Sequence, residues 1–453
     1  MNQDTICAIA TAQGGAIGSI RVSGADAIRI TSHIFTPAKS GKALADCKPY
    51  TLTFGKIHDG EEIIDEVLVS LFRAPHSYTG EDSTEITCHG SSYILQQVLQ
   101  LLIKHGCRLA GPGEYTQRAF LNGKMDLSQA EAVADLIASS SAATHRLAMS
   151  QMRGGFSKEL TELRNQLLHF TSLIELELDF SDHEELEFAD RTELYRLADH
   201  IEGVISRLVH SFSVGNAIKN GVPVAIIGET NAGKSTLLNV LLNEDKAIVS
   251  DIHGTTRDVI EDTTNIGGIT FRFIDTAGIR ETNDAIEQIG VERSRKSLNE
   301  ADLVLYLIEK GAELDAEDQA NLALIGDKPL LFVANKADLA NDATVTLPAE
   351  YVEISALTGD GLTDLSQKIK AKFISGETDF SSHAVLSNVR HFHAVNQALS
   401  DLTNFHDNLS AELPFDLLVI DLQHAWEVLG TINGDTVEED LLDVIFSKFC
   451  LGK

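Results

Sequence analysis

The stretch VPVAIIGETNAGKSTLLNVLL, residues 222–242, decides the fold of the central part of the chain. It passes from an apolar run through a glycine-rich loop into a helical run, a context in which loop N–H groups and a helix dipole converge on phosphate. A glycine-rich turn without a ligand is the alternative, which this context disfavours. We expect Lys234 to reach the β- and γ-phosphates of a nucleotide and Ser235 to coordinate Mg²⁺. The nucleotide-binding residues expected in this loop are Asn231, Ala232, Gly233, Lys234, Ser235 and Thr236.

A second motif, DTAG at residues 275–278, follows the strand-like run ITFRFI. A carboxylate at the end of such a strand, here Asp275, can hold Mg²⁺ through water, and the Gly278 N–H can meet the γ-phosphate. Alone, DTAG also fits a simple turn. Its place downstream of the glycine-rich loop favours the phosphate site.

A third motif, NKAD, begins at Asn335, at the end of the apolar run PLLFVAN. The Asp338 carboxylate can accept from both guanine N1–H and the exocyclic amine, a pair of donors that adenine lacks. Lys336 belongs to the same motif. Ser355 and Ala356 complete the base pocket, with the Ala356 N–H near the guanine carbonyl oxygen. The order of these motifs predicts GTP as the nucleotide.

The segment IVSDIHGTTRD, residues 248–258, lies between the first two motifs. A threonine in a mobile loop can ligate Mg²⁺ only while the γ-phosphate is present, which makes a switch. Thr256 is the candidate ligand. A threonine-rich surface loop is the alternative.

The spacing of apolar residues changes along the chain and predicts several domains. Up to about residue 122, the short runs IGSIRVSG, YTLTFGKI, EVLVSLF and STEITCHG favour strands, with SYILQQVLQLLIKHG as a helix packed on them. The imperfect alternation of Ile64, Val67, Val69 and Leu71 fits strands buried partly on both faces.

From Met125 onward, apolar residues recur at three and four residues, which is typical of one helix face. The two expected stripes are Leu160, Leu163, Leu167, Phe170, Ile174 and Leu178, then Leu194, Leu197, Ile201, Val204, Leu208 and Phe212. Helical sequence resumes near Ser382 and includes Val385, Val389 and Phe392. We therefore expect long bundled helices on both sides of the nucleotide motifs.

The expected fold class is multidomain, α/β and α. An α+β N-terminal domain spans 1–122, a helical bundle domain spans 123–215 and 376–453, and a P-loop GTPase α/β domain, 216–375, interrupts the helical one. Within that inserted domain, apolar runs alternate with helical stretches and predict a mainly parallel sheet with helices on both faces.

Composition narrows the class of protein. The 453 residues include 36 basic and 67 acidic ones, a formal charge of −31, so any nucleic acid must be held by a local patch or a partner. No apolar stretch is long enough for a membrane helix, and no signal peptide is visible, which indicates a cytoplasmic protein. The five cysteines form no C-x-x-C pair, and neither disulfides nor zinc are expected.

GETNAGKSTLLN, IVSDIHGTTRD, DTAGIRET, NKAD and SAL together resemble the G domain of the MnmE (TrmE) family of bacterial tRNA modification GTPases. The flanks GEYTQRAFLNGKMDLSQAEAVADLI and FCLGK agree, so the resemblance covers essentially the whole chain. It implies a homodimer formed through the N-terminal domain and a flavoprotein partner of the MnmG (GidA) type. Their joint product is an aminomethyl-type substituent on carbon 5 of the tRNA wobble uridine.

The resemblance also implies how GTP is hydrolysed. Ile279 stands where Ras-type GTPases carry a water-orienting glutamine, and an alkyl side chain cannot orient water. The family uses a potassium ion near the phosphates and a glutamate that positions water, which Glu287 matches; a solvated helix charge is the alternative. The residues that match the potassium ligands are Asn231, Ser250, Ile252 and Thr255.

Finally, the family binds a formyl-type tetrahydrofolate, and Arg21, Glu81, Lys124 and Lys453 match its folate-binding positions. Arg21 and Lys124 also fit ordinary surface charges. Cys450 is expected to be exposed near this site, either as a reactive thiol or as a small residue that fits. A regulatory or ribosome-assembly GTPase without modification chemistry is the competing function.

Overall fold

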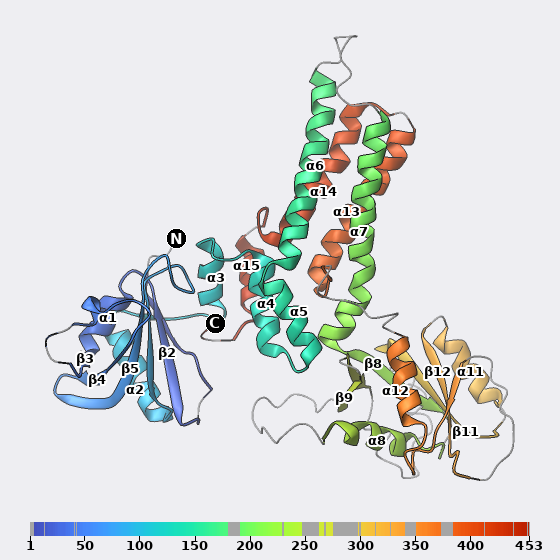
Figure 1. The fold of residues 1–453 in the computed structure, drawn as a ribbon, viewed down its shortest axis with the longest axis horizontal. Helices are drawn as coiled ribbons and strands as arrows, with labels where there is room; N and C mark the ends of the chain where they lie inside the picture. Colours follow the sequence, from blue (N-terminus) through green and yellow to red (C-terminus); the bar gives the residue numbers. More distant parts are fainter. Residues whose placement is uncertain are drawn as a thin grey trace. The chain divides into compact units, whose positions relative to one another are not determined.

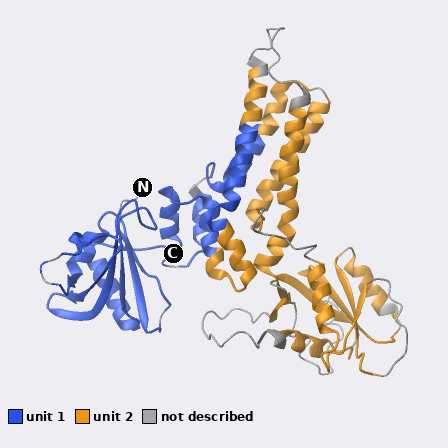
Figure 2. Cartoon of the chain, in the orientation of Figure 1, with its two compact units in different colours: residues 1–134, 151–168, 423–453 blue, residues 135–150, 169–422 orange. Residues whose placement is uncertain are grey.

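The structure is a computed structural model that describes residues 4–12, 14–39, 41, 43–179, 191–228, 231–246, 262–266, 269–274, 298, 300–312, 314–326, 328–339, 350–372, 384–411, 413–437, 439–450 and 452. The chain divides into two compact units (Figure 2). One comprises residues 1–134, 151–168 and 423–453, and the other comprises residues 135–150 and 169–422.

The first unit contains a mixed sheet of strand order β3-β4-β5-β6-β2-β1-β7, in which only β1 and β7 pair in parallel. Helices α1 (Ala27–Ile34) and α2 (Ser92–Lys104) pack on one face and share a core with it (Figure 1). The strands are β1 (Ile6–Ile9), β2 (Ile17–Ser23), β3 (Phe35–Pro37), β4 (Leu52–Asp59), β5 (Glu62–Phe72), β6 (Ser83–His89) and β7 (Arg108–Leu109). The α+β prediction is confirmed, although β1, β3, β7 and α1 were not predicted from the sequence.

A β-bulge explains the imperfect alternation in β5. Ile57 of β4 pairs with Asp65, whereas the next residue, His58, pairs with Ile63, so Ile64 is an extra residue on β5. Beyond it the alternation is regular, and Val67, Val69 and Leu71 are all buried against the helices. The opposite face of this strand is not buried, because Leu68 is 39% exposed.

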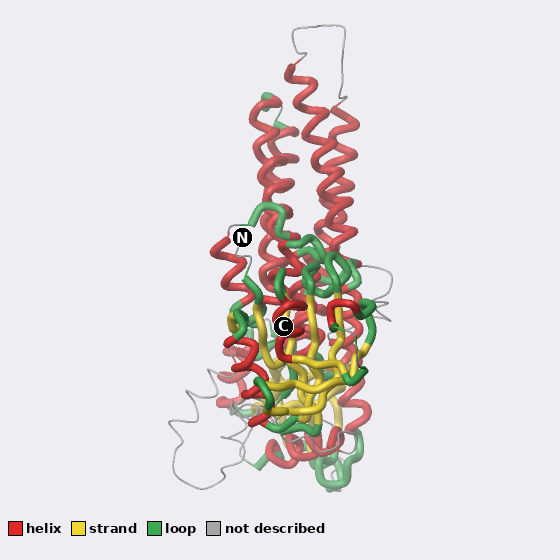
Figure 3. The backbone as a smooth tube through the Cα atoms, turned by 90° about the vertical axis from the view of Figure 1, so that its left-hand side faces the viewer, coloured by secondary structure: helices red, strands yellow, loops and turns green. Residues whose placement is uncertain are grey.

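The helices after the sheet are α3 (Glu114–Leu121), α4 (Leu127–Ala138), α5 (Ala142–Met152), α6 (Gly155–Asp179) and α7 (Arg191–Asn220). Those near the carboxyl end are α13 (Val389–Ser410), α14 (Phe415–Asn433) and α15 (Glu439–Phe446). Long helices run side by side (Figure 3): Phe170 of α6 packs on Phe405 of α13, and Phe212 of α7 stacks on Phe392 of α13 at 4.2 Å. The predicted bundle is confirmed.

The two predicted apolar stripes agree with the observed burial to different degrees. The α6 stripe is fully buried through Ile174, while the side chain of Leu178 lies outside the described residues. In α7, Leu197, Val204 and Phe212 are only half-buried. The buried face of that helix is Leu194, Ala198, Ile201, Ile205 and Leu208. These residues alternate steps of four and three, so the face that packs inward is rotated slightly from the predicted one.

Two helix boundaries also differ from the prediction. Helix α7 continues to Asn220, past the boundary expected after residue 215, and the next strand starts at Val222. Helix α13 starts at Val389, not near Ser382, because the Asn388 side chain accepts from the Arg390 N–H and caps it. Residues 384–388 before it are not helical.

The second unit contains a sheet of order β13-β12-β11-β8-β10-β9, parallel except that β9 pairs antiparallel with β10. Its strands are β8 (Val222–Gly228), β9 (Asp262–Ile266), β10 (Ile269–Phe273), β11 (Leu303–Glu309), β12 (Leu330–Asn335) and β13 (Tyr351–Glu353). Its helices are α8 (Lys234–Lys246), α11 (Ala316–Ile325) and α12 (Leu362–Ala371). Strand β9 was not predicted from the sequence.

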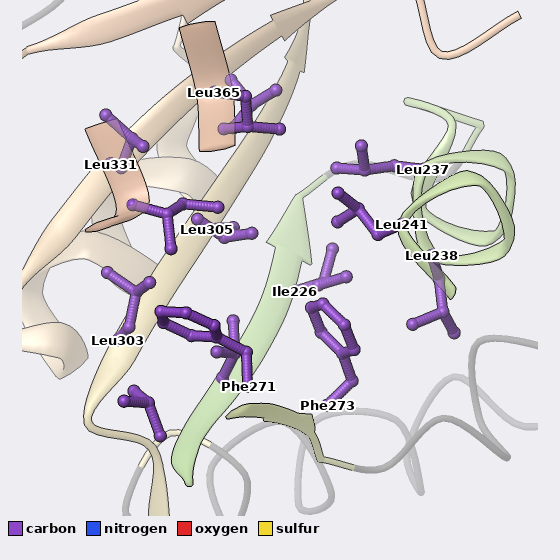
Figure 4. Packing of buried hydrophobic residues seen from close by; sticks show 14 of the residues in the cluster. Ile226, Leu237, Leu238, Leu241, Phe271, Phe273, Leu303, Leu305, Leu331 and Leu365 are labelled. Atoms are coloured by element: carbon purple, nitrogen blue, oxygen red, sulfur yellow. The ribbon is translucent and has the colours of Figure 1, made fainter. Parts of the chain in front are cut away.

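Both faces of this sheet are covered, which confirms the α/β prediction. On one face Val224 and Ile226 pack with Leu237 of α8 and Leu365 of α12 (Figure 4). On the other, Ala225 and Ile227 belong to a separate core with Ile325 of α11, Tyr306 and Phe332. A strand buried on both sides reads as a continuous apolar run, as VPVAIIG does.

Candidate functional site

The glycine-rich loop joins the end of β8 to the start of α8, as expected. Gly228 has φ 144° and a Cβ there would lie 1.9 Å from the Leu307 carbonyl oxygen, so only glycine fits beside β11. Gly233 has φ 99°, and its Cβ would lie 2.2 Å from the Asn335 Nδ2. Asn231 is left-handed at φ 68°, a conformation that asparagine tolerates better than most residues. Gly228 and Gly233 therefore cannot be replaced by larger residues unless the neighbouring Leu307 or Asn335 moves.

Asn335 connects three of the sequence motifs. Its Nδ2 donates to the Ala232 carbonyl at 2.8 Å, and its Oδ1 accepts from the Ala356 N–H at 2.9 Å. The residue is only 3% exposed. A buried amide that satisfies both neighbours is costly to replace, since either backbone group would lose its partner. The structure thus brings the glycine-rich loop, NKAD and SAL to one edge of the sheet.

Asp338 is oriented by the serine of the last motif. The Ser355 hydroxyl donates to Asp338 Oδ1 at 2.6 Å and accepts from the Thr358 N–H at 3.2 Å. An ionised carboxylate has about four acceptor sites, so the bond from Ser355 leaves it capacity for two donors of a base. The Ala337 N–H donates to the Ile354 carbonyl at 3.0 Å, which holds NKAD against the chain leading to Ser355.

The two lysines of the motifs occupy different surroundings. Lys234 Nζ donates to the Gly228 carbonyl at 2.6 Å, so its ammonium group lies over its own loop. Lys336, at φ 64°, extends to the end of β11, where its Nζ pairs with Glu309 Oε2 at 2.6 Å. Ser235 is half-buried and Thr236 exposed in the first turn of α8.

Several predicted site residues lie outside the described part of the chain. These are Ser250, Ile252, Thr255, Thr256, Asp275, Gly278, Glu287 and Lys453. Their roles in binding Mg²⁺, potassium, water and folate remain predictions. Within the residues that the structure does describe, no group of three or more His, Cys, Asp or Glu side chains could hold a metal ion.

A second candidate site is a cavity of about 80 Å³ in the N-terminal sheet. Its lining combines aromatic rings with polar groups: Arg21, Val22, Ser23, Phe72, Tyr78, Thr79, Ser83, Thr84, Glu85 and Tyr115. Arg21 on β2 stands directly opposite Glu85 on β6, and its Nε donates to Glu85 Oε1 at 2.8 Å. The Tyr115 hydroxyl donates to the Arg21 carbonyl at 2.9 Å.

Among the predicted folate residues, Arg21 lines this cavity directly. Glu81 is connected to the cavity through a single hydrogen bond, because Ser23 lines the cavity and its Oγ donates to Glu81 Oε2 at 2.7 Å. Lys124 lies next to Gly80, because a Cβ added to Gly80 would lie 3.4 Å from the aliphatic carbons of the Lys124 side chain. Lys124 Nζ donates to the Pro75 carbonyl at 2.9 Å. Sequence reasoning missed Glu85, Tyr78 and Tyr115, because only strand register and packing reveal that they face Arg21.

The carboxyl-terminal tail lies against the same domain. Phe446 and Phe449 are buried with Leu127. Cys450 is exposed, as predicted, and its carbonyl accepts from the Gly113 N–H at 3.4 Å. The Gly452 carbonyl accepts from Arg21 Nη1 at 3.1 Å. The tail therefore reaches one of the residues that line the cavity.

Comparisons with known proteins show the family of the chain. A family model described as MnmE helical domain matches residues 127–450, and one described as GTP-binding protein TrmE N-terminus matches residues 5–124. The chain is 64% identical over 466 residues to the tRNA modification GTPase MnmE of Bacteroides thetaiotaomicron, with 100% of both chains covered. It is 49% identical over 469 residues to that of Flavobacterium johnsoniae, again with 100% of both covered.

Solved structures also match part of the chain. A crystal structure of Aquifex aeolicus Era bound to GDP.AlF4- is 32% identical and covers 40% of this chain and 66% of that one, with a TM-score of 0.27. Within the described residues, no helix is long and apolar enough to cross a membrane.

Proposed function

Because this chain belongs to the MnmE family of tRNA modification GTPases and is a GTP hydrolase that acts in tRNA modification, we propose a specific reaction for it. With a flavoprotein of the MnmG (GidA) type, it installs a carboxymethylaminomethyl-type group on carbon 5 of the tRNA wobble uridine in the cytoplasm. GTP hydrolysis is stimulated by potassium and depends on dimerisation of the G domains.

The observation that carries this proposal is the Asn335 junction. One buried amide joins the phosphate loop at Ala232 to the base loop at Ala356, so phosphate and base are recognised by one connected unit. Asp338, held by Ser355, accepts the two guanine donors. Lys234 exchanges the Gly228 carbonyl for the β- and γ-phosphates, because a charge-assisted bond is the stronger one.

Potassium and Mg²⁺ fit the chemistry of the predicted donors. Hard cations take oxygen ligands, and the Asn231 amide and the Ser235 hydroxyl both supply them beside the loop. A bound potassium ion neutralises charge that develops between the β- and γ-phosphates. Glu287 orients the attacking water in place of the missing glutamine at Ile279.

The N-terminal cavity suits a flat, polar heterocycle such as the pyrimidinone ring of a formyl-type tetrahydrofolate. Phe72, Tyr78 and Tyr115 supply apolar ring faces, and Arg21 supplies a cation. At about 80 Å³ the cavity is well below the 300–1,000 Å³ of a typical ligand pocket, so it encloses only one end of such a ligand. Glu81 accepts from the ring N–H groups, and Lys124 and Lys453 contact the rest of the molecule.

The uncovered face of the N-terminal sheet supports the homodimer. Leu52, Phe54 and Leu68 are 65%, 50% and 39% exposed, and Phe54 stands directly opposite Leu68 on the neighbouring strand. A cluster of apolar side chains on a regular sheet favours contact with a second surface. Since the resemblance implies dimerisation through this domain, we assign that surface to a second copy of the chain.

Mass spectrometry of wobble uridines tests the proposal. Cells lacking this protein should lose the carbon-5 substituent and regain it with the full chain. Restoration should fail with Lys234→Ala, which removes the phosphate-binding ammonium. If modification persists in the deleted cells, the protein is a regulatory or ribosome-assembly GTPase instead and the proposed chemistry is wrong.

A further inference from the structure

We propose that Arg118 is a positioning residue for the folate site, which orients the Glu81 carboxylate so that it selects a ligand with two adjacent N–H donors. This inference rests on the proposed folate function and adds to it a residue that no motif indicated. Arg118 lies on α3, within the run GEYTQRAFLNG.

Arg118 contacts Glu81 from the interior of the domain and is itself held by two further residues. Its Nη1 donates to Glu81 Oε1 at 3.1 Å and lies 3.3 Å from Oε2. The same nitrogen donates to the Asp4 carbonyl at 2.9 Å, and Nη2 donates to Asp4 Oδ1 and Glu114 Oε1 at 2.8 and 2.9 Å. Arg118 is only 8% exposed, so its guanidinium is held in one orientation.

Glu81 is held from the cavity side as well. Ser23 Oγ, which is 1% exposed and lines the cavity, donates to Glu81 Oε2 at 2.7 Å. The backbone of the same residue is also held, because Ser77 Oγ donates to the Glu81 carbonyl at 2.6 Å. With its position set from two sides, the carboxylate can discriminate by hydrogen-bond geometry, which a mobile side chain does poorly.

The net charge of the side chains around Arg118 supports the same conclusion. The cluster contains two cations, Arg118 and Arg108, and three carboxylates, Asp4, Glu81 and Glu114, which leaves one formal negative charge. A buried guanidinium needs carboxylate partners, and here it has three. The excess negative charge favours the electropositive N–H edge of a reduced pterin ring, whose N3–H and 2-amino groups lie side by side.

Arg108 provides a matched control. It belongs to the same network, with Nε 2.6 Å from Asp4 Oδ2 and Nη2 2.5 Å from Glu114 Oε1, and its side chain is 46% exposed. Its guanidinium donates to Asp4, Glu114 and the Leu109 carbonyl, and it makes no hydrogen bond to Glu81. Loss of Arg108 therefore perturbs the network without loosening Glu81.

The test is isothermal titration calorimetry of the full chain with 5-formyltetrahydrofolate and with its 2-desamino analogue. Wild type should prefer the first by about tenfold to hundredfold, the range for one hydrogen bond to a charged group. Arg118→Gln should reduce that preference to nearly none while still binding both compounds through Arg21 and the aromatic walls. Arg118→Lys should restore part of the preference, and Arg108→Gln should keep all of it.

The outcomes separate the two levels of the proposal. If wild type binds neither compound, the folate function itself is wrong. If wild type discriminates and Arg118→Gln discriminates equally, only the role of Arg118 is wrong. Should Arg118→Gln fail to fold, Arg118→Lys keeps the buried charge but loses the planar fork that contacts Glu81, and discrimination equal to that of wild type in this variant overturns the inference.

Discussion

At the scale of single residues, the nucleotide site tolerates little change in side-chain size or in hydrogen-bonding groups. Gly233 packs against Asn335, and a methyl group there would force apart the junction between the phosphate loop and the base loop. Asn335 satisfies Ala232 and Ala356 at once, which no apolar or acidic side chain can do. The site is therefore sensitive to changes that leave its charge untouched.

The first prediction concerns base recognition by Asp338. Replacing it by asparagine removes the charge that accepts two guanine donors, so GTP affinity should fall about 100-fold, as expected for two bonds of about 1.5 kcal/mol each. Xanthosine triphosphate, which accepts at carbon 2, should bind better than GTP. Competition between the two nucleotides for the purified variant measures both effects. Comparable GTP affinity in variant and wild type would remove the assignment.

At the scale of secondary-structure elements, capping residues set where helices begin. Helix α11 starts after Asp315, whose Oδ1 accepts from the Asp318 N–H at 2.8 Å, while Asp318 Oδ2 accepts from the Asp315 N–H at 3.0 Å. Asp318 Oδ1 in turn accepts from the buried Tyr306 hydroxyl at 2.5 Å. A capping box thus fastens α11 to β11 at the core of the GTPase sheet.

The second prediction follows from that cap. Asp315→Ala leaves helix donors unsatisfied and should lower the free energy of unfolding of the GTPase domain by about 1 kcal/mol. Urea unfolding followed by circular dichroism measures the change. Gln319→Ala, on the exposed side of the same helix, is the control and should change stability little. Equal stability of Asp315→Ala and wild type would show that the cap does not hold the helix.

At the scale of the whole molecule, the GTPase sheet and the N-terminal cavity belong to separate compact units. The cavity and the tail with Cys450 lie in the first unit, whereas all described nucleotide-site residues lie in the second. Chemistry at one site can therefore be removed without destroying the fold of the other. Two predictions rely on this separation.

The third prediction concerns the cation. Hydrolysis should be much faster in potassium than in sodium at equal ionic strength, because the larger ion fits the predicted oxygen ligands beside the phosphates. G domains should pair on addition of GDP and aluminium fluoride in potassium. Steady-state phosphate release and analytical ultracentrifugation provide the two measurements. Equal rates in both salts, without pairing, would contradict the proposal.

The fourth prediction separates the tail from the GTPase. Cys450→Ser should leave GTP hydrolysis nearly intact and abolish tRNA modification, since the thiol is exposed beside Gly113 of the first unit and far along the chain from the nucleotide motifs. Phosphate release and nucleoside mass spectrometry measure the two activities. Modification at the wild-type rate would mean that the tail only shapes the folate pocket.

Local patterns by themselves determined much of this protein. The order of GETNAGKS, DTAG, NKAD and SAL, the apolar run VPVAIIG and the helical periodicity after Met125 predicted the inserted GTPase domain and the bundle. Such patterns are local because each strand or helix encodes its own period and its own ends. They also located the loop in which Asn231 and Lys234 lie.

Only the tertiary structure decided which distant residues meet. Asn335 contacts Ala232 across 103 residues of sequence, and Arg21 contacts Gly452 across 431. The bulge at Ile64 and the place of Glu85 opposite Arg21 likewise depend on strand register. Register and packing are set by which buried faces fit together over the whole domain, so no single stretch of sequence contains that information.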